Sequence, residues 1–302
     1  MKTPFNRRTF LKATSATFAA AAFTPTSLTA AEFSARKRPL KKAIMYGTVA
    51  VKGTVMEKFR AVKEAGFEGV EPNGGMDQDD VVKAFEATGL KAASVCCHSH
   101  WAKPLSDPNP TARQVGLEGL KQSLRDAKRY GATSVLLVPG VARSGVSYED
   151  CWQRSIAEIR KAIPLAEELQ VAISIENVWN DFITKETEAV RYLDEINSPW
   201  VKWHFDIGNI IYYGDPIAWI KALGKRIARL HIKEYSRDLA MKKGRGAGFS
   251  AKFLEGANDW PGIMKALDEI GYDAWGIAEQ GGGDSPDGLR DLSQRMDKIF
   301  GS

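Results

Sequence analysis

Cysteine and long hydrophobic runs are scarce in this chain of 302 residues. Three cysteines cannot build a disulfide framework. Cys96 and Cys97 are adjacent in an expected strand, where neighbouring side chains point to opposite faces, so we do not expect them to pair. Buried free thiols are the favoured interpretation. The apolar stretch near the N-terminus, residues 13–23, is too short to span a membrane.

The N-terminal segment has the pattern of a secretory signal. Arg7 and Arg8 form a twin-arginine motif within residues 6–12, the weakly apolar stretch follows, and small residues surround Ala31. We therefore predict a twin-arginine signal peptide over residues 1–31 and a linker over residues 32–42. The mature chain is expected to be exported in folded form to the periplasm or the cell exterior, with no membrane anchor once the signal is removed.

The mature chain lacks a strong excess of either charge. The predicted signal holds four basic residues and no acidic one, so its removal lowers the formal net charge from +5 to +1. A nearly neutral protein offers no broad basic surface, and we expect no nucleic-acid partner. Its length, about 270 residues, is close to the roughly 250 of a single eightfold β/α barrel.

Strand-like and helix-like segments alternate from residue 43 to the C-terminus. Strands are expected at 43–48, 67–71, 91–97, 133–138, 171–176, 200–206, 226–232 and 274–279. Helices are expected at 54–65, 78–88, 112–130, 148–169, 185–196, 215–223, 260–270 and 285–299. Eight such pairs predict an α/β fold with a single (β/α)8 TIM barrel over residues 43–302. An open doubly wound sheet is the alternative, but no glycine fingerprint follows the first strand.

One connection, residues 236–259, is unusually long and carries a basic, glycine-rich stretch at 242–248. Long loops at the carboxyl ends of barrel strands are often lids or substrate clamps. The glycines do not form a phosphate-binding P-loop, because no Gly-Lys-Ser/Thr opens a helix here. A solvated basic loop and an anion-binding lid remain equal alternatives.

Four predicted strands end in a residue that can bind a metal: Glu176, Asp206, His231 and Glu279. Side-chain alternation places each of them on the inward face of its strand. The carboxyl ends of all strands meet at one mouth of a barrel, where active sites of this fold lie. We therefore expect these four residues to surround one point.

Each of these residues has an ordinary structural explanation when it is taken alone. A carboxylate at a strand end is often a helix cap or part of a salt bridge, and an inward histidine is often hydrogen-bonded in the core. Three carboxylates brought together without a cation would repel one another. The set therefore favours one divalent ion, for which Mn, Co, Mg and Zn are the candidates.

The motifs at residues 175–177, 205–209, 231–234 and 278–279 resemble those of the xylose isomerase-like TIM barrel superfamily, above all its sugar and sugar-phosphate 3-epimerases. The resemblance extends over roughly residues 43–300. It implies that the four residues bind one divalent ion and that Glu176 and Glu279 also act as the acid/base pair. It also matches Arg237 to an arginine that contacts substrate.

Asn209 stands where some ketose epimerases have a substrate-binding histidine. The Asp-x-Gly-Asn form looks more like the sugar-phosphate branch, whereas the expected export argues against a phosphorylated substrate. We give more weight to the expected export than to this motif.

Other strand ends supply further candidates for substrate binding. Glu71 closes the second strand, His98 and Trp101 follow the third, and Lys233 follows His231. Trp101 and Trp179 lie in loops where an indole can stack on a sugar ring, with local packing as an equal alternative. His98 shares its strand parity with Cys96 and is expected to reach the mouth, whereas the placement of His100 is left open.

The expected function is that of a metal-dependent isomerase or epimerase of a ketose or related keto-sugar. One glutamate would remove a proton to give an enediolate, and the other would return it. A lyase or hydratase of oxidised sugars would use the same site. A metal endonuclease of the abasic-site type needs several metals and more than four histidines. A sugar-binding protein would need no acid/base pair. The expected partner is a small-molecule sugar, and a homo-oligomer stays an open alternative to a monomer.

Overall fold

The computed structural model describes residues 38–142 and 145–302. The predicted signal peptide over residues 1–31 and residues 32–37 of the predicted linker lie outside the described residues. Within the described part, no helix combines the length and the apolar character that a membrane span requires. The first strand begins at Lys41, two residues before the predicted start of the barrel.

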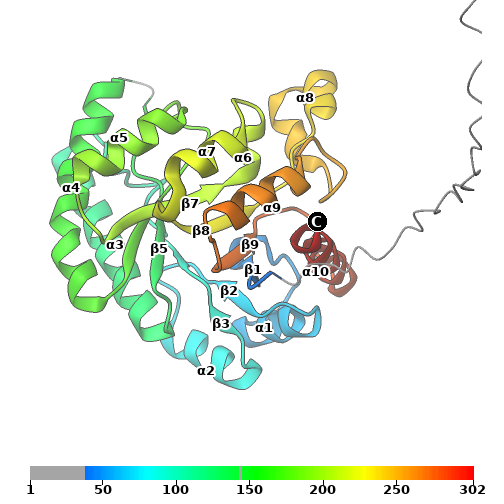
Figure 1. The fold of residues 1–302 in the computed structure, drawn as a ribbon. Helices are drawn as coiled ribbons and strands as arrows, with labels where there is room; N and C mark the ends of the chain where they lie inside the picture. The colour runs from blue at the N-terminus through cyan, green and yellow to red at the C-terminus, as the bar shows by residue number, and fades with distance from the viewer. Residues whose placement is uncertain (1–37, 143–144) are drawn as a thin grey trace, which may run out of the picture. The chain divides into compact units, whose positions relative to one another are not determined.

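Among the described residues, nine parallel strands form the sheet, in the order β3-β2-β1-β9-β8-β7-β6-β5-β4 (Figure 1). Their bounds are Lys41–Met45 (β1), Gly69–Glu71 (β2), Lys91–Ala92 (β3), Val95–Cys96 (β4), Ser134–Leu137 (β5), Ala172–Glu176 (β6), Val201–Asp206 (β7), Ile227–Ile232 (β8) and Trp275–Ala278 (β9). The short strands β3 and β4 are two parts of the single strand predicted at 91–97. Since β3 pairs with β2 and β4 pairs with β5, this strand joins both ends of the sheet. The predicted single (β/α)8 barrel is confirmed.

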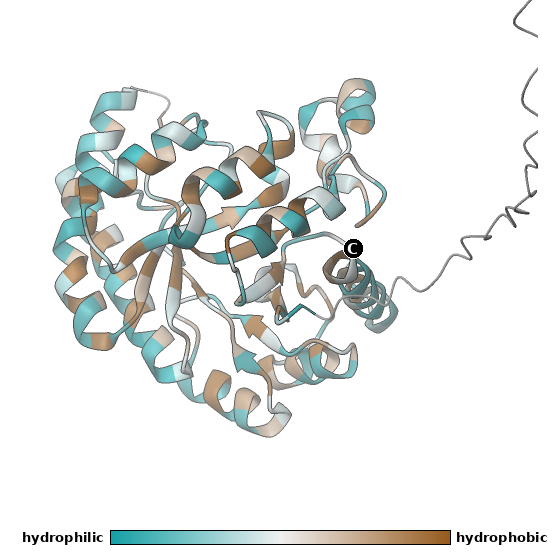
Figure 2. Cartoon of the chain, viewed as in Figure 1, coloured by the Kyte–Doolittle hydropathy of each residue, from teal (hydrophilic) through white to brown (hydrophobic). Residues whose placement is uncertain are grey.

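The helices surround the sheet and follow the strands along the chain. Their bounds are Val55–Glu64 (α1), Gln78–Thr88 (α2), Pro110–Tyr130 (α3), Tyr148–Leu169 (α4), Glu186–Ile196 (α5), Ile207–Ile211 (α6), Pro216–Leu223 (α7), Arg237–Lys243 (α8), Trp260–Glu269 (α9) and Pro286–Gly301 (α10). Three short 3-10 helices add to these, at Tyr46–Thr48, Gly224–Arg226 and Arg245–Ser250. The predicted eight helices are present, and α6 and α8 are additional short helices in the loops after β7 and β8. Hydrophilic and hydrophobic residues share each outer helix, as expected for helices with one face on a sheet (Figure 2).

Local signals explain where the helices begin and end. Thr54 and Glu57 form a reciprocal capping box at the start of α1. Gly131 ends α3 in the left-handed conformation, with φ of 77°, which costs a glycine no steric strain. Both signals can be recognised in the sequence, and each lies within one residue of the predicted helix end.

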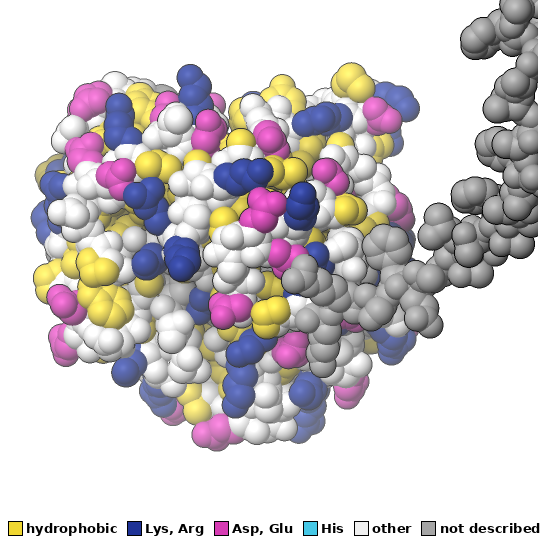
Figure 3. Space-filling view, in the orientation of Figure 1, with side chains coloured by type: hydrophobic (Ala, Val, Ile, Leu, Met, Phe, Trp, Pro, Cys, Tyr) yellow, Lys and Arg dark blue, Asp and Glu magenta, His cyan; other side chains and the backbone are white. Residues whose placement is uncertain are grey.

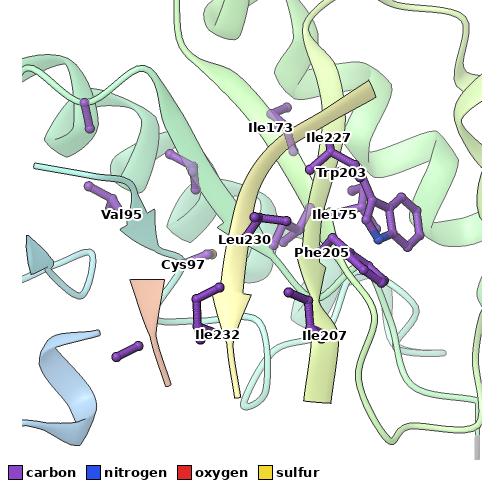
Figure 4. Packing of buried hydrophobic residues seen from close by; sticks show 14 of the residues in the cluster. Val95, Cys97, Ile173, Ile175, Trp203, Phe205, Ile207, Ile227, Leu230 and Ile232 are labelled. Atoms are coloured by element: carbon purple, nitrogen blue, oxygen red, sulfur yellow. The ribbon is translucent and has the colours of Figure 1, made fainter. Parts of the chain in front are cut away.

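The main core lies between the outward faces of the strands and the helices. Ile173 and Ile175 of β6, Trp203 and Phe205 of β7, and Leu230 of β8 are all fully buried there (Figure 4). Their neighbours in sequence point the other way, into the barrel, because side chains alternate along a strand. Burying this outward set therefore fixes which residues face the mouth.

The barrel interior is packed below the mouth. The Ser134 and Ser174 hydroxyls are hydrogen-bonded at 2.7 Å. The Arg229 guanidinium donates to the Ala93 carbonyl and, through Nη2 at 2.7 Å, to the Thr133 hydroxyl. These polar side chains of the interior thus find hydrogen-bond partners within the barrel.

The long loop over residues 236–259 is held against the barrel by the buried Glu234. Its carboxylate accepts hydrogen bonds from the amides of Leu254 (2.7 Å) and Asn258 (3.3 Å) and from the Trp260 indole (2.9 Å). The Gln280 side-chain amide donates to the carbonyl of Phe249 at 2.9 Å. The loop is therefore anchored from two strand ends.

Cys96, Cys97 and Cys151 are buried and free, in agreement with the expectation that the thiols form no disulfide.

Candidate active site

The four predicted ligands converge at the mouth of the barrel. Glu176 ends β6, Asp206 ends β7, His231 lies in β8 and Glu279 directly follows β9. One donor atom from each lies within 4.8 Å of the others. The Nδ1 atom of His231 is 2.8 Å from Glu176 Oε1 and 2.9 Å from Glu279 Oε2. Parallel strands of matched length bring these side chains together, as side-chain alternation predicted.

Lys233 supplies positive charge to this cluster. Its Nζ atom lies 3.3 Å from Asp206 Oδ2 and 3.0 Å from Glu279 Oε2. Burial raises the pKa of Asp206 to about 8 and also raises that of Glu176. Burial acts in the same direction on Glu279, but Lys233 and His231 outweigh it and hold the pKa of Glu279 below its usual range. The carboxylates thus compete for the positive charge available to them.

The other side of the His231 ring contacts Glu71. His231 Nε2 is 2.9 Å from Glu71 Oε2, and both side chains are buried, at 1% and 0% exposure. Burial lowers the pKa of His231, but the carboxylates of Glu71, Glu279 and Glu176 raise it well above the usual value. A histidine that donates one N–H to a carboxylate presents its second nitrogen in a fixed direction, as metal-binding histidines do. Here the second nitrogen, Nδ1, faces Glu176 and Glu279.

These donors fit a divalent ion. Three carboxylates and one oriented imidazole are a ligand set for a hard or borderline cation, and their mutual repulsion needs one. Glu176, Asp206, His231 and Glu279 would hold the ion, and Glu71 would orient the histidine.

His204 forms the floor beneath His231. The two rings meet edge to face, with centroids 4.2 Å apart. Neither ring nitrogen has a hydrogen-bond partner among the described residues, and the nearest carboxylate oxygen, Glu71 Oε1, is 3.9 Å from Nδ1. Burial is the main cause that lowers the pKa of His204 well below its usual value, so this ring is neutral. His204, Glu71 and His231 form a buried polar layer under the carboxylates.

A cavity of about 240 Å³ opens above the cluster. Of the residues predicted to bind substrate, Trp101, Asn209 and Lys233 lie in its wall, together with Glu176, His231 and Glu279. Trp179, which was considered for stacking on a sugar, also lines it. Asn209 is held by two hydrogen bonds, from its amide to Asp206 Oδ1 (2.8 Å) and from its side chain to the Asn177 carbonyl (3.0 Å).

The structure places the other predicted substrate contacts elsewhere. Glu71 lies beneath His231 and is fully buried, so it is not part of the cavity wall. His98 is exposed and packs beside Gly74 and Gly75, whereas His100 lines the cavity. Burial lowers the pKa of His100 to about 4, and its Nδ1 accepts a hydrogen bond from the Val138 amide.

Arg237 also lies outside this cavity. It begins α8, and its Nε and Nη2 atoms donate to the carbonyl of Ile211 at 3.2 and 2.9 Å. The Ser236 cap and the helical turn direct the guanidinium toward the loop after β7.

Several wall residues were not predicted from the sequence: Met45, Cys96, Leu136, Val178 and Phe249. Cys96 shares the inward parity of its strand, and that pattern could have indicated it. Phe249 lies within the long loop, where no periodic pattern reports orientation. Its ring contacts Trp179, with centroids 4.7 Å apart, and Lys233 Nζ lies 4.8 Å from its centroid. The loop thus contributes to the cavity and is not only a solvated basic segment.

Comparisons with known proteins agree with this architecture. The chain is 22% identical over 233 residues to L-ribulose-5-phosphate 3-epimerase of Salmonella paratyphi A, covering 72% of this chain and 78% of the relative. It resembles the structure of 3-keto-D-glucoside 4-epimerase from E. coli, with a TM-score of 0.72, 16% identity, and coverage of 86% and 98% of the two chains. For D-psicose 3-epimerase crystallised with D-fructose, the TM-score is 0.72, at 15% identity and coverage of 87% and 100%.

A structure of the IolI protein with a bound zinc atom is similar at a TM-score of 0.69, with 17% identity and coverage of 86% and 98%. The curated relatives are sugar epimerases, in agreement with the predicted enzyme class. Residues 59–299 match the family described as xylose isomerase-like TIM barrel. The chain therefore belongs to the xylose isomerase-like TIM barrel family.

Proposed function

We propose that this protein is a divalent-metal-dependent epimerase or isomerase of a ketose or related keto-sugar. The observation that carries the proposal is the position of two glutamates at one buried imidazole. Glu176 and Glu279 come from strands on either side of β7 and β8, and both approach His231 Nδ1, at 2.8 and 2.9 Å. A sugar in the cavity above would lie between two carboxyl groups.

In the proposed reaction, one glutamate removes the proton from the carbon next to the carbonyl group. A divalent ion held by the four ligands would supply positive charge for the oxygen atoms of the deprotonated sugar. The second glutamate returns a proton from the opposite face and so inverts the carbon. Return to the neighbouring carbon would give isomerisation instead.

Other wall residues would orient the sugar. Trp101 and Trp179 offer aromatic faces on which a sugar ring can stack, and Lys233 offers an ammonium donor to hydroxyl oxygens. Phe249, from the long loop, would help to exclude water from the reacting carbon. We further propose that residues 1–31 export the folded protein by the twin-arginine route, so that its substrate is met in the periplasm or outside the cell.

The test is proton exchange with solvent. Metal-loaded mature protein is incubated with ketoses and keto-glycosides in deuterium oxide, and the deuterated carbon is identified by NMR. We expect the wild type to exchange one substrate proton and Glu176→Gln and Glu279→Gln to lose exchange while keeping the circular dichroism spectrum of the fold. Exchange at the wild-type rate in both variants would reject the assignment.

Two further measurements on the same protein separate the two alternative functions. A lyase or hydratase would show exchange together with loss or gain of water, seen as a change in product mass. A metal endonuclease would bind several ions per chain, whereas we expect one by elemental analysis. Basic and acidic side chains are interspersed on the face drawn in Figure 3, which offers no broad basic groove for nucleic acid.

A further inference from the structure

A second cavity lies at the same end of the barrel. It has a volume of about 330 Å³ and is lined by Tyr212, Arg237, Ala240, Met241 and Arg245. Tyr212 directly follows α6, after β7, and the other four residues belong to the long loop after β8. These are two of the strands that carry the candidate metal ligands, so both cavities are formed by the same set of loops.

Trp179 lines the first cavity and contacts two residues that line the second. Its indole lines the 240 Å³ cavity above the candidate metal ligands, hereafter the metal cavity, and its ring centroid is 5.3 Å from that of Tyr212. The Arg245 guanidinium stacks on the same indole, 4.7 Å from the centroid, and lies 5.7 Å from the Tyr212 ring. A ligand that starts in the metal cavity and extends past Trp179 therefore meets Arg245.

The two arginines of this wall have hydrogen-bonding capacity left. Arg237 uses Nε and Nη2 on the Ile211 carbonyl, and Arg245 Nη1 donates to the Tyr213 hydroxyl at 3.5 Å. Within residues 38–142 and 145–302, neither forms an ion pair with a carboxylate. The N–H groups of Arg245 that are not used on Tyr213 match the geometry of a carboxylate or a phosphate.

The rest of the wall suits the carbon skeleton of a ligand. Met241 is 77% exposed and Tyr212 is 47% exposed, which makes them two of the most exposed large apolar side chains of the described residues. An apolar wall with two guanidinium groups that have no carboxylate partner among the described residues is typical of a site for a small organic anion.

We propose that this second cavity binds an anionic group of the substrate, a carboxylate or a phosphate, held by Arg245 and Arg237. The reacting carbon of the same molecule would lie in the metal cavity on the other side of Trp179. The inference rests on the proposed function for the identity of the reacting sugar, and it narrows the substrate class to acidic keto-sugars.

The test measures the affinity for each probe, by calorimetry on the metal-loaded mature protein. The probes are D-fructose, D-fructuronate and D-fructose 6-phosphate, which differ in carrying no charge, a carboxylate or a phosphate. We expect one of the acidic probes to bind at least about tenfold more tightly than D-fructose, and Arg245→Gln to remove that preference. Lys243→Gln is the matched control, since it removes the same charge from exposed α8 outside the cavity wall.

Equal binding of neutral and acidic probes, or no binding of any, would overturn the subsite. So would an equal loss in Lys243→Gln and Arg245→Gln, because that result would mean attraction by general charge. Deuterium exchange is measured separately, so a preference for acidic probes without exchange would count against the proposed function and not against the subsite. The probe that binds more tightly identifies the anion.

Discussion

Replacement of Glu71 should weaken metal binding although Glu71 is not a proposed ligand. Its carboxylate accepts the hydrogen bond from His231 Nε2 at 2.9 Å, and both side chains are buried, with at most 1% of their surface exposed. Without the carboxylate, the Nε2–H group would be buried and unpaired, which costs about 1–3 kcal/mol. Since about 1.4 kcal/mol corresponds to a factor of ten, the metal affinity should fall roughly 10- to 100-fold.

The assay is titration of Mn²⁺ into the metal-free mature protein, followed by calorimetry. Glu71→Ala should lose more affinity than Glu71→Gln, because the glutamine amide oxygen can still accept the hydrogen bond. Glu68→Gln is the matched control, since Glu68 is exposed and directly precedes the same strand, and this variant should bind Mn²⁺ as the wild type does. Wild-type affinity in both Glu71 variants, with the fold intact by circular dichroism, would refute the reasoning.

Three further outcomes are expected. Affinity for Mn²⁺ should fall as the pH is lowered from 8 to 6. The pKa values of Asp206 (about 8) and His231 are raised, so the ion must displace protons from these residues when it binds. The dependence of the binding heat on the buffer measures the release of these protons. Chelation of the metal should lower the melting temperature, and added Mn²⁺ should raise it again with concentration, as a thermal scan would show; an unchanged temperature would contradict binding to the folded state. Glu234→Ala should lower the free energy of unfolding by about 3 kcal/mol, because three donors, of which the Trp260 indole is buried, lose their acceptor. Glu255→Ala at an exposed ion pair should lower it by less than about 1 kcal/mol, and equal urea midpoints would contradict this account.

The convergence of Glu176, Asp206, His231 and Glu279 could be predicted because it depends on two regular features. Side chains alternate along each strand, and the carboxyl ends of parallel strands meet at one end of a barrel. Val201, Trp203 and Phe205 show the same regularity on the outer side of β7, where burial leaves no freedom to reverse the strand.

The depth of a side chain within the barrel, and the direction of side chains in the loops, could not be predicted in the same way. Glu71 ends its strand as Glu176 does, but β2 has only three residues, and the stagger of the sheet places Glu71 beneath His231. His98 follows β4 after its ladder has ended at Cys96, so strand alternation no longer determines its direction. Arg237 begins a helix whose existence the sequence pattern did not indicate, and the helical turn determines where its guanidinium points.

The balance of charge around His231 links the proposed metal to the proposed acid/base chemistry. Four carboxylates, those of Glu71, Glu176, Asp206 and Glu279, surround this histidine and Lys233. An imidazole that binds a metal must be neutral, so the carboxylates and the one ammonium group leave three negative charges, and a divalent ion reduces them to one. Burial disfavours even that last charge, and one proton on Glu176, whose pKa burial raises, would remove it. A site with one protonated and one ionised glutamate is the state that the proposed proton removal on one face and proton return on the other would require, so the proposed ion and the proposed acid/base pair would depend on the same set of residues.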